Sequence, residues 1–376
     1  MPKAAKKDIP EVYFTSIRTK VGTSLLDKLS CLLDKAGFGK LGLERKYVAV
    51  KIHFGERGNL AFLRPNFART VVDKIKEAGG KPFLTDCNTL YVGSRKDALE
   101  HLETAMLNGF VPEVVGCPVI IGDGLKGTDE VAVPVKGGEI LKEALIGRAV
   151  MDADVVVTLN HFKGHEMMGM GGAIKNLGMG CGSRAGKKVM HCDSIVEVNS
   201  ERCVGCGACA RTCAHGAPVI DKRKCHISEN VCVGCGRFIG VCPTDAIAPI
   251  WSDKAGLLDL KTAEYALAVV QDRPNFHVNF VMDVSPFCDC HPESDAAIVP
   301  DVGIFASFDP VAVDQACADA VLAQPVIENS YLGKSKVKGR DHFGCVSPST
   351  DWTKQLAHAE KIGMGSRKYK LVKVEN

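Results

Sequence analysis

The stretch YVAVKIHFGERGNLAFLRPNFARTVVDKIKEAGGKPFLTD, residues 47–86, decides the fold of the chain. Its two ends, 47–54 and 81–86, are short apolar runs that are typical of buried strands. Between them, residues 64–80 repeat apolar side chains at three- and four-residue spacing and end in glycines, which is typical of a helix. A strand, a helix and a second strand of these lengths predict a βαβ unit with parallel strands.

The same alternation extends through most of the chain. Further strands are expected at 11–17, 154–162, 275–284 and 301–307. Further helices are expected at 23–37, 94–110, 138–153, 257–271 and 309–323. Ser94 is the expected N-cap of the 94–110 helix, and Asp309 with Pro310 is expected to begin the last one. We therefore predict an α/β fold with a mostly parallel sheet.

The alternation stops at about residue 164 and resumes near residue 257. Residues from about 198 to 250 have the composition of a ferredoxin and are flanked by polar residues, as domain insertion favours. We predict three parts. The first part of an α/β body covers 1–197, an inserted two-cluster ferredoxin-like module of α+β type covers 198–250, and the second part of the body covers 251–376.

The composition excludes several classes of protein. Hydrophobic residues make up 46% of the chain and charged residues 24%, which is ordinary for a soluble globular protein. A formal net charge of +3 gives no support for nucleic-acid binding, and no apolar run approaches the ~20 residues of a membrane span. The first residues lack the apolar stretch of a secretory signal, so the expected location is the cytoplasm.

The 17 cysteines are the unusual feature of the composition, and their densest group lies in the predicted insert. The sequence CVGCGACARTC places Cys203, Cys206, Cys209 and Cys213 at the x2, x2, x3 spacing of bacterial ferredoxins. Thiolates are soft ligands that favour iron–sulfur clusters, and the glycines between them let the backbone wrap tightly. A structural zinc site is the alternative, but a near-copy of the motif follows and favours a pair of clusters.

The second motif, CVGCGRFIGVCP, has Phe238 where the third cysteine is expected. In two-cluster ferredoxins the fourth cysteine of each motif ligates the other cluster. One 4Fe–4S cluster is then held by a complete set, Cys203, Cys206, Cys209 and Cys242. The other is held by Cys213, Cys232 and Cys235 and lacks a ligand.

Cys225 is the candidate for the missing ligand. It lies seven residues before Cys232, where a residue that shields a cluster is expected. We hypothesise an exchange of roles, with Cys225 ligating and Phe238 packing. Two other interpretations stay open: a 3Fe–4S cluster held by three cysteines, and loss of the second cluster.

A second unusual stretch, residues 159–193, is rich in glycine and follows a predicted strand. It contains His161, Lys163, His165, Lys175 and Asn176. The basic residues favour an anionic ligand, and histidines suit proton transfer near neutral pH. Metal binding by His161 and His165 and a plain packing turn are the alternatives.

Three other predicted strand ends bring further candidates to the same place. They carry His53, then Asp86 with Asn88, and then the Cys-x-Cys pair of Cys288 and Cys290. The pair is interpreted as a redox dithiol or as soft metal ligands. The candidate catalytic residues of this cleft are His53, His161, Lys163, His165, Lys175, Asn176, Cys288 and Cys290.

Several stretches together resemble a family of proteins from anaerobes known as domain of unknown function 362, in its form with a ferredoxin-type insert. The matching stretches are KIHFGE, LTDCNTLY, LNHFKGHEMMGMGGAIKNLGMGCGSRAGK, CDCHPESD and GIFASFDPVAVDQA. The resemblance implies a 4Fe–4S protein with an α/β body of unsettled activity. It also implies two complete cluster motifs, from which Phe238 departs.

The leading hypothesis is an iron–sulfur oxidoreductase that passes electrons from 4Fe–4S clusters to an anionic substrate or a further centre in the α/β cleft. Its expected partners are a low-potential electron donor or acceptor protein and an unidentified anionic small molecule. Two alternatives are a non-catalytic electron carrier or cluster and metal delivery protein, and a metal-dependent transferase or hydrolase with structural clusters.

Overall fold

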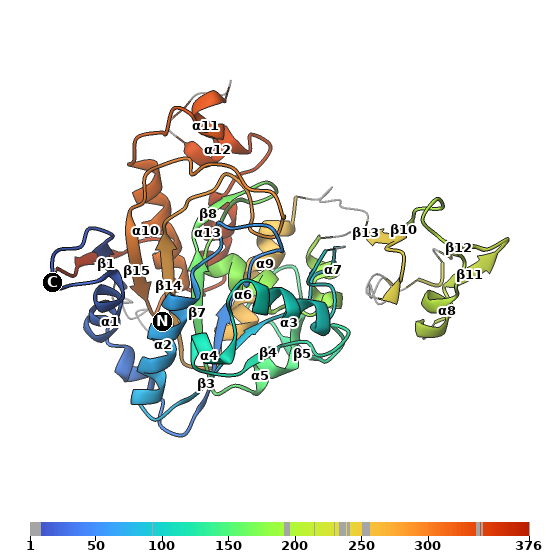
Figure 1. Ribbon diagram of the computed structural model, residues 1–376, viewed down its shortest axis with the longest axis horizontal. Helices are drawn as coiled ribbons and strands as arrows, with labels where there is room; N and C mark the ends of the chain where they lie inside the picture. Colours follow the sequence, from blue (N-terminus) through green and yellow to red (C-terminus); the bar gives the residue numbers. More distant parts are fainter. Residues whose placement is uncertain are drawn as a thin grey trace, which may run out of the picture.

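The body of the protein is one eight-stranded sheet, described here from a computed structural model (Figure 1). The structure describes residues 9–91, 93–191, 196–213, 215–228, 230–232, 238, 241–249, 256–335, 339 and 341–375. The strand order in the sheet is β16-β1-β15-β14-β7-β2-β3-β4. Its strands are β1 (Glu11–Ser16), β2 (Tyr47–Ile52), β3 (Lys81–Asp86), β4 (Val119–Ile121), β7 (Val155–His161), β14 (Asn275–Val281), β15 (Gly303–Ser307) and β16 (Lys370–Lys373).

The sheet is mostly parallel, as the sequence predicts. Strands β14, β7, β2, β3 and β4 run parallel to one another, whereas β15 is antiparallel to both β14 and β1. The strands before and after the insert join the same sheet, because β14 pairs with β7 and β15 pairs with β1. The two predicted parts of the body therefore share one sheet.

Helices cover both faces of this sheet (Figure 1). The helices are η1 (Phe38–Leu41), α1 (Leu25–Lys35), α2 (Pro65–Glu77), α3 (Ala98–Leu107), α4 (Pro112–Val115), α5 (Arg148–Asp152), α6 (Ala173–Cys181), α7 (Arg184–His191), α8 (Ala208–Thr212), α9 (Leu258–Val270), α10 (Pro310–Leu322), α11 (Tyr331–Lys334), α12 (His342–Val346) and α13 (Thr353–Lys361). One buried core contains side chains of α1 and α2, and the other contains side chains of α6, α9, α10 and α13. Alternate residues of β2 enter the two cores, since Val48 and Val50 lie in the first and Ala49 in the second.

Two local predictions differ from the structure. The N-cap of α3 is Asp97, whose carboxylate accepts hydrogen bonds from the N–H groups of Leu99 and Glu100, whereas Ser94 bonds Glu56 instead. The expected helix at 138–153 is a strand, β6 (Glu143–Gly147), followed by the short α5. Strand β6 pairs with β5 (Glu130–Pro134) in a hairpin, and this pairing overrides the helical spacing of its apolar residues.

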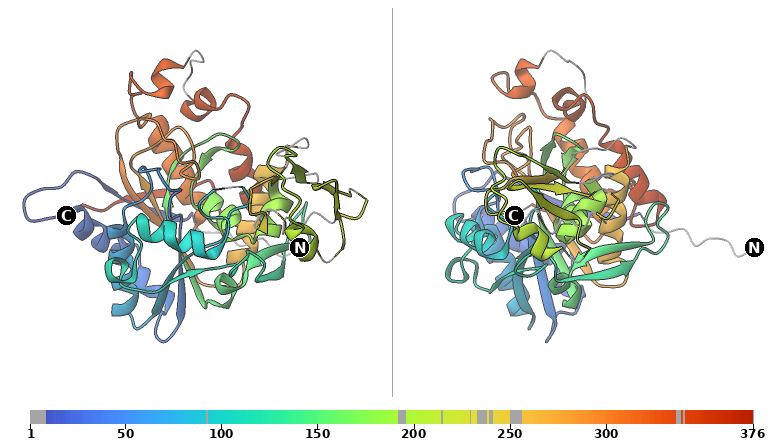
Figure 2. Two further views of the ribbon diagram at one scale, coloured as in Figure 1. Left: turned by 45° about the vertical axis from the view of Figure 1, so that its right-hand side comes forward. Right: turned by 90° about the vertical axis from the view of Figure 1, so that its right-hand side faces the viewer.

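The cysteine-rich residues lie at one side of the body, the side on which α7 is labelled in Figure 1, and Figure 2 shows them from two further directions. Their described elements are α8, β10 (Val196–Val198), β11 (Pro218–Asp221), β12 (Lys224–Ile227) and β13 (Ile247–Pro249). Strands β10 and β13 pair antiparallel, and so do β11 and β12. The side chain of Leu90, which belongs to the body, is buried with the cysteines of this segment. Lys96 of the body also forms an ion pair with Asp245, at a distance of 2.9 Å between Nζ and Oδ1.

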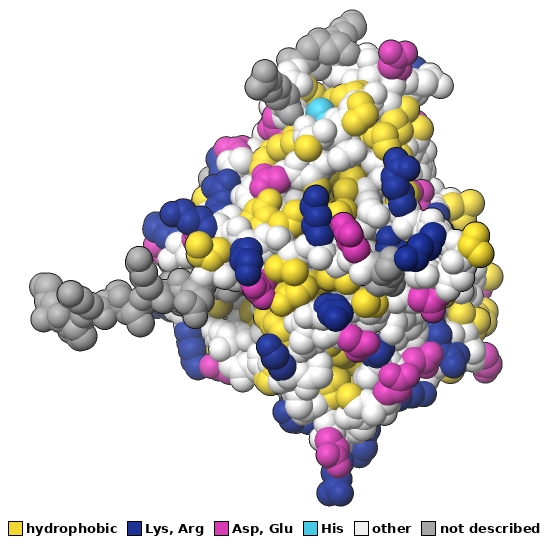
Figure 3. Space-filling model, turned by 90° about the vertical axis from the view of Figure 1, so that its left-hand side faces the viewer, with side chains coloured by type: hydrophobic (Ala, Val, Ile, Leu, Met, Phe, Trp, Pro, Cys, Tyr) yellow, Lys and Arg dark blue, Asp and Glu magenta, His cyan; other side chains and the backbone are white. Residues whose placement is uncertain are grey.

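The surface carries charges of both signs. On the face shown in Figure 3, basic and acidic side chains are interspersed with apolar ones, in keeping with the nearly balanced charge. Among the residues that the structure describes, there is no helix with the length and apolar character needed to cross a membrane.

Candidate functional site

A cavity of about 390 Å³ lies at the carboxyl ends of the parallel strands. This is where an open α/β sheet places its ligand sites, because the loops that leave neighbouring strands meet there. The cavity brings together seven of the eight candidate residues of the cleft. They are His53, His161, Lys163, His165, Lys175, Asn176 and Cys290, and Cys288 lies directly behind Cys290.

His53 and His165 present the same nitrogen to the cavity. In each ring Nδ1 accepts a hydrogen bond from the backbone N–H two residues later, that of Gly55 at 3.0 Å and that of Met167 at 3.1 Å. Because Nδ1 is used as an acceptor, the proton of the neutral ring lies on Nε2. Burial and the nearby Arg95 lower the pKa of His53 well below its ordinary value, so this ring is neutral. Each histidine therefore offers an Nε2–H donor.

His161 is engaged at both ring nitrogens. Its Nε2 lies 2.9 Å from the carbonyl oxygen of Met282, and its Nδ1 lies 2.8 Å from a carboxylate oxygen of Asp289. A carbonyl can only accept, so Nε2 carries a proton, and Nδ1 is occupied by the carboxylate. Burial alone would raise the pKa of Asp289, but His161 and Lys163 hold it at about 2. His161 therefore fixes the turn that contains Asp289 and has no nitrogen left for proton transfer.

A buried network of charges forms the floor of the cavity. Lys51 lies 3.0 Å from Asp86 and 2.6 Å from the side-chain oxygen of Asn176. Asn176 also donates to the side chain of Asn160, so its polar atoms are used within the protein. Arg95 pairs with Glu56 at 3.0 Å and lies 3.6 Å from Asp86. Asn176 is therefore a positioning residue, although it lines the cavity.

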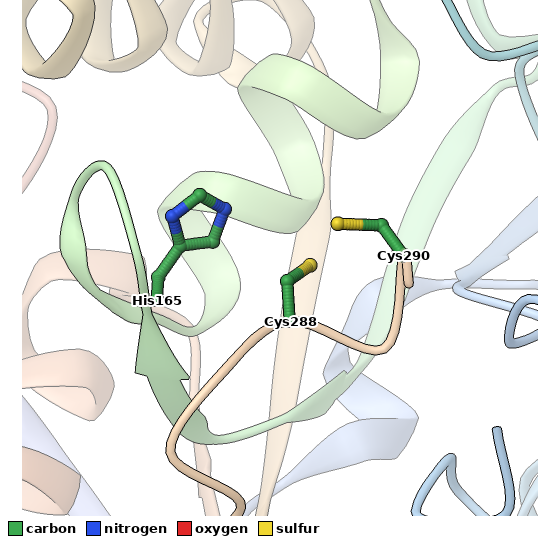
Figure 4. A group of neighbouring side chains, drawn as sticks. All are labelled: His165, Cys288 and Cys290. Carbon is green, nitrogen blue, oxygen red and sulfur yellow. The ribbon is translucent and has the colours of Figure 1, made fainter. Parts of the chain in front are cut away.

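The Cys288–Cys290 pair lies in the loop after β14, several residues beyond the strand end where the sequence predicts it. In Figure 4 the two sulfur atoms are turned toward each other and the ring of His165 faces them. Lys175 Nζ lies 3.1 Å from Cys288 Sγ, and Lys163 Nζ lies 3.7 Å from the same atom. Burial alone would raise the pKa of Cys288, but Cys290, the two lysines and His165 hold it well below its ordinary value.

The position of this pair depends on close backbone packing. Lys163 and His165 belong to β8 (Lys163–His165), which pairs with β9 (Gly169–Gly171). A Cβ atom added to Gly164 would lie 2.1 Å from the carbonyl oxygen of Pro286, so only glycine permits this approach. The N–H of Gly164 also donates to the carbonyl of Ser285 at 2.9 Å. These contacts hold the loop of Cys288 directly against the strand that carries the cations.

Two groups of side chains have the spacing of metal ligands. The ligand atoms of His165, Cys288 and Cys290 all lie within 4.8 Å of one another, and the same holds for Glu166, Cys290 and His291. Glu166 joins the two groups, because its carboxylate accepts from the N–H of Cys288 at 3.3 Å and lies 3.1 Å from His291 Nε2.

The complete cysteine set of the insert fits an iron–sulfur cluster. Cys203, Cys206, Cys209 and Cys242 line one common space. Backbone N–H groups point at two of these sulfurs, that of Cys225 at Cys203 (3.3 Å) and that of Ala246 at Cys242 (3.2 Å). Backbone N–H groups are typical partners of cluster-bound thiolates.

In the structure Cys225 lies close to the complete set of cysteines. Its sulfur lies 3.5 Å from that of Cys209, and it lines the space of the complete set. Burial and Cys209 raise the pKa of Cys225 to about 12. Phe238 is buried in the same apolar cluster, with an exposed fraction of 2%. In the incomplete set, Cys213 and Cys232 are half-buried, and Cys235 lies outside the described residues.

Three residues that line the cavity were not predicted from the sequence. They are Tyr91, Arg95 and Asp289. Asp289 lies between the two cysteines, and only this position signals its role. Arg95 follows a glycine–serine pair that is typical of a loop, so nothing in its surroundings predicts a buried guanidinium.

Comparisons with known proteins give matches to parts of curated proteins, a likeness to a solved structure and a match to a family model. The thylakoid-associated protein sll1697 of Synechocystis sp. is 30% identical over 166 residues, which cover 42% of this chain and 46% of that protein. The indolepyruvate oxidoreductase subunit IorA of Pyrococcus abyssi is 37% identical over 71 residues, 18% of this chain and 10% of that one. A crystal structure of a Thermotoga maritima protein aligns with a TM-score of 0.38 at 12% identity, covering 79% of this chain and 58% of that chain.

A family model matches most of the chain. The chain spans less than half the length of the curated relatives above, so these matches concern only parts of each protein. The family model instead matches residues 48–319, which include the parallel strands, the cavity and the cysteine-rich segment. By this match the chain belongs to the family described as domain of unknown function, DUF362.

Proposed function

We propose that the protein is a cytoplasmic iron–sulfur oxidoreductase that transfers electrons between 4Fe–4S clusters in the insert and an anionic substrate, or a further centre, in the cleft. When bound, the clusters supply single electrons at low potential. The ligands of the first would be Cys203, Cys206, Cys209 and Cys242. A ferredoxin-like donor protein would supply the electrons.

One observation carries this proposal: Leu90 belongs to both sites. Its side chain lines the cavity, and it is also buried in the apolar cluster that contains Cys203, Cys209 and Cys225. Leu90 therefore touches both the cavity and the cysteine-rich segment. Such an arrangement suits transfer of electrons between them better than it suits a separate docking module.

The cleft residues suit an anionic ligand. Lys163 and Lys175 supply positive charge, and His53 and His165 supply Nε2–H donors. Methionine and leucine side chains also line the cavity. Ammonium groups and imidazole N–H donors that are largely buried bind an anion more strongly than they do in water.

Reoxidation of the reduced protein tests the proposal. Protein purified without oxygen is reduced by a low-potential donor and then mixed with candidate anionic metabolites, while the visible absorbance of the clusters is followed. We expect at least one metabolite to restore the oxidised spectrum at a catalytic rate. Lys163→Met should slow this reoxidation more than tenfold. If only partner proteins reoxidise the clusters, the proposal is contradicted and the protein is an electron carrier. If the protein catalyses a reaction whose rate does not depend on the redox state of the clusters, the proposal is also contradicted and the clusters are structural.

Iron counts on cysteine variants test the ligand sets. Cys242→Ala should lose about four irons, the content of one cluster, because it removes a member of the complete set. Cys225→Ala should retain its iron, because Cys225 lies next to the set of Cys203, Cys206, Cys209 and Cys242, which is complete without it. Iron and sulfide analysis with EPR measures both. A loss of about four irons in Cys225→Ala would instead support the exchange of roles.

A further inference from the structure

The Cys288 sulfur lies in an unusually cationic environment. Lys175 and Lys163 approach it to 3.1 and 3.7 Å, and the ring of His165 faces it with a ligand atom within 4.8 Å (Figure 4). Cys288 is 1% exposed and Lys163 is 4% exposed, so water screens these charges little. Burial alone would lower the pKa of Lys175, but the neighbouring Cys288 raises it above its ordinary value. Lys175 and Cys288 thus stabilise each other as an ion pair.

This environment disfavours a divalent metal between the same sulfurs. A cation bound there would lie only a few ångströms from two buried ammonium groups, and like charges at such distances repel strongly. A metal-bound histidine also donates its second ring N–H to a carbonyl or a carboxylate. His165 Nδ1 instead accepts an N–H from Met167, which leaves the proton on Nε2 and makes that nitrogen a donor. The charges and the tautomer both suit an anionic sulfur.

We propose that Cys288 and Cys290 form a redox-active dithiol in which Cys288 is a thiolate and Cys290 donates its S–H to it, and that this pair is the two-electron centre of the cleft. The proposal rests on the proposed function for the source of its electrons. In the oxidised form a bond joins the two sulfurs. Two electrons, delivered singly from the reduced iron–sulfur clusters, and one proton break this bond and give the Cys288 thiolate and the Cys290 thiol. The pair would then reduce an anionic acceptor that takes two electrons.

The local geometry allows this chemistry. The two sulfurs lie within 4.8 Å of each other (Figure 4), and the residues are separated only by Asp289, in a turn. Residues two apart in a turn fall within the Cα separations of about 4.4–6.8 Å at which disulfides form. Hydrogen bonds from His161 to Asp289 and from the N–H of Cys288 to Glu166 hold the turn in place. Cys290 lines the cavity, which gives the pair its access to an acceptor.

The lysines also set the direction of the redox equilibrium. A thiolate that is stabilised in the reduced form makes the corresponding disulfide easier to reduce. Loss of one lysine charge destabilises the reduced form, so a larger fraction of the pair is oxidised at the same redox poise. A dependence of the thiol–disulfide equilibrium on Lys175 therefore distinguishes a redox-active dithiol from two thiols that only lie close together.

Thiol trapping across a series of glutathione redox mixtures tests the proposal. The anaerobic protein is quenched in acid, labelled with N-ethylmaleimide and digested with trypsin. The peptide 262–334 contains Cys288, Cys290 and Cys317, and no other cysteine, because trypsin does not cleave between Arg273 and Pro274. Cys317 is buried in α10 and serves as the internal reference. We expect three labels in reducing mixtures and one label, on Cys317, in oxidising mixtures, with one two-electron transition.

Matched variants complete the test. Lys175→Met should shift the transition to more reducing mixtures by about tenfold in the equilibrium constant, which is about 30 mV for two electrons. Lys175→Arg keeps the positive charge, so its equilibrium constant for reduction should stay within about threefold of that of the parent. The amino group of Lys163 is farther from Cys288 Sγ, so Lys163→Met should shift the transition less. This variant replaces Lys175→Met as the test if Lys175→Met does not fold. Three labels in every mixture, or one equivalent of bound zinc that Cys288→Ser releases, would overturn the dithiol.

The proposed function can fail separately. Trapping does not need the clusters, so Cys242→Ala should keep the same transition while it loses iron. If no metabolite reoxidises the clusters but the trapping transition and its dependence on Lys175 are found, the oxidoreductase proposal fails and the dithiol stands.

Discussion

Asp86→Asn is expected to lower the free energy of unfolding by about 3–5 kcal/mol, the cost of removing one partner from a buried ion pair. Asp86 is 2% exposed, and its carboxylate lies 3.0 Å from Lys51 and 3.6 Å from Arg95. Asparagine keeps the shape but leaves two buried cations with Glu56 as the remaining anion of the network. Denaturation in urea at pH 7 measures the difference.

The same variant has a defined pH dependence. Burial alone would raise the pKa of Asp86, but the neighbouring cations, with Lys51 foremost, hold it far below its ordinary value of 3.8. A depressed pKa in the folded state contributes stability above the unfolded pKa and loses it as the pH falls toward the folded pKa. The difference in unfolding free energy between the parent and Asp86→Asn should therefore have its full value above about pH 5. It should decrease progressively below about pH 4.

An exposed ion pair supplies the control. Lys136 and Asp272 lie 2.5 Å apart, but both are more than half exposed. Asp272→Asn should cost less than about 1 kcal/mol, as surface pairs do. If Asp86→Asn costs no more than this control, the buried network is not a source of stability.

Gly178→Ala is expected to cost about 3 kcal/mol of unfolding free energy, at the upper end for overpacking of a core. Gly178 lies in α6 where this helix crosses α9, and an added Cβ would lie 2.1 Å from the carbonyl oxygen of Thr262. Neither backbone can move without disturbing the core between the helices. The helix preference of alanine over glycine, about 1 kcal/mol, opposes the clash but is smaller than it. Thermal and urea denaturation measure the net effect.

Gly39→Ala is the matched control for this prediction. Gly39 lies in η1, and a Cβ built on it meets no atom within 4 Å. Its substitution should change stability by less than about 1 kcal/mol, with a small gain from the stiffer unfolded chain. Equal effects at positions 39 and 178 would mean that α6 and α9 separate readily, in contradiction to the close crossing.

The parallel core of the fold follows from local sequence patterns. The pattern of residues 47–86 predicts β2, α2 and β3, and the carboxyl ends of β2 and β7 predict that His53 and His161 lie at the same edge of the sheet. The helix expected at 138–153 failed because its apolar residues suit a helix and a strand equally, and pairing with β5 decided the outcome. Such pairing depends on contacts outside the segment.

The chemistry of the site was only partly predictable. Residue types indicated that lysines and cysteines gather in the cleft, but the contact of Lys175 with Cys288 joins residues more than 100 positions apart. The roles of the three histidines depend on which backbone groups face each ring nitrogen, which no spacing reveals. Cys225 was predicted as a ligand of the second cluster, and this stays a prediction; its 3.5 Å approach to the sulfur of Cys209 depends on how the β11–β12 hairpin folds, which the spacing of the cysteines does not reveal.

The register of β10 with β13 has a consequence for how such a protein arises. Val198 faces Ile247 and Val196 faces Pro249, so the chain leaves the body and returns to it at neighbouring points. The strands on either side of this excursion already pair within one sheet. In topological terms the cysteine-rich segment is a long loop of the body. A gene could gain, lose or exchange this segment without changing the order of the strands in the body. Evolution could thus replace the cysteine-rich segment and keep the residues of the cleft.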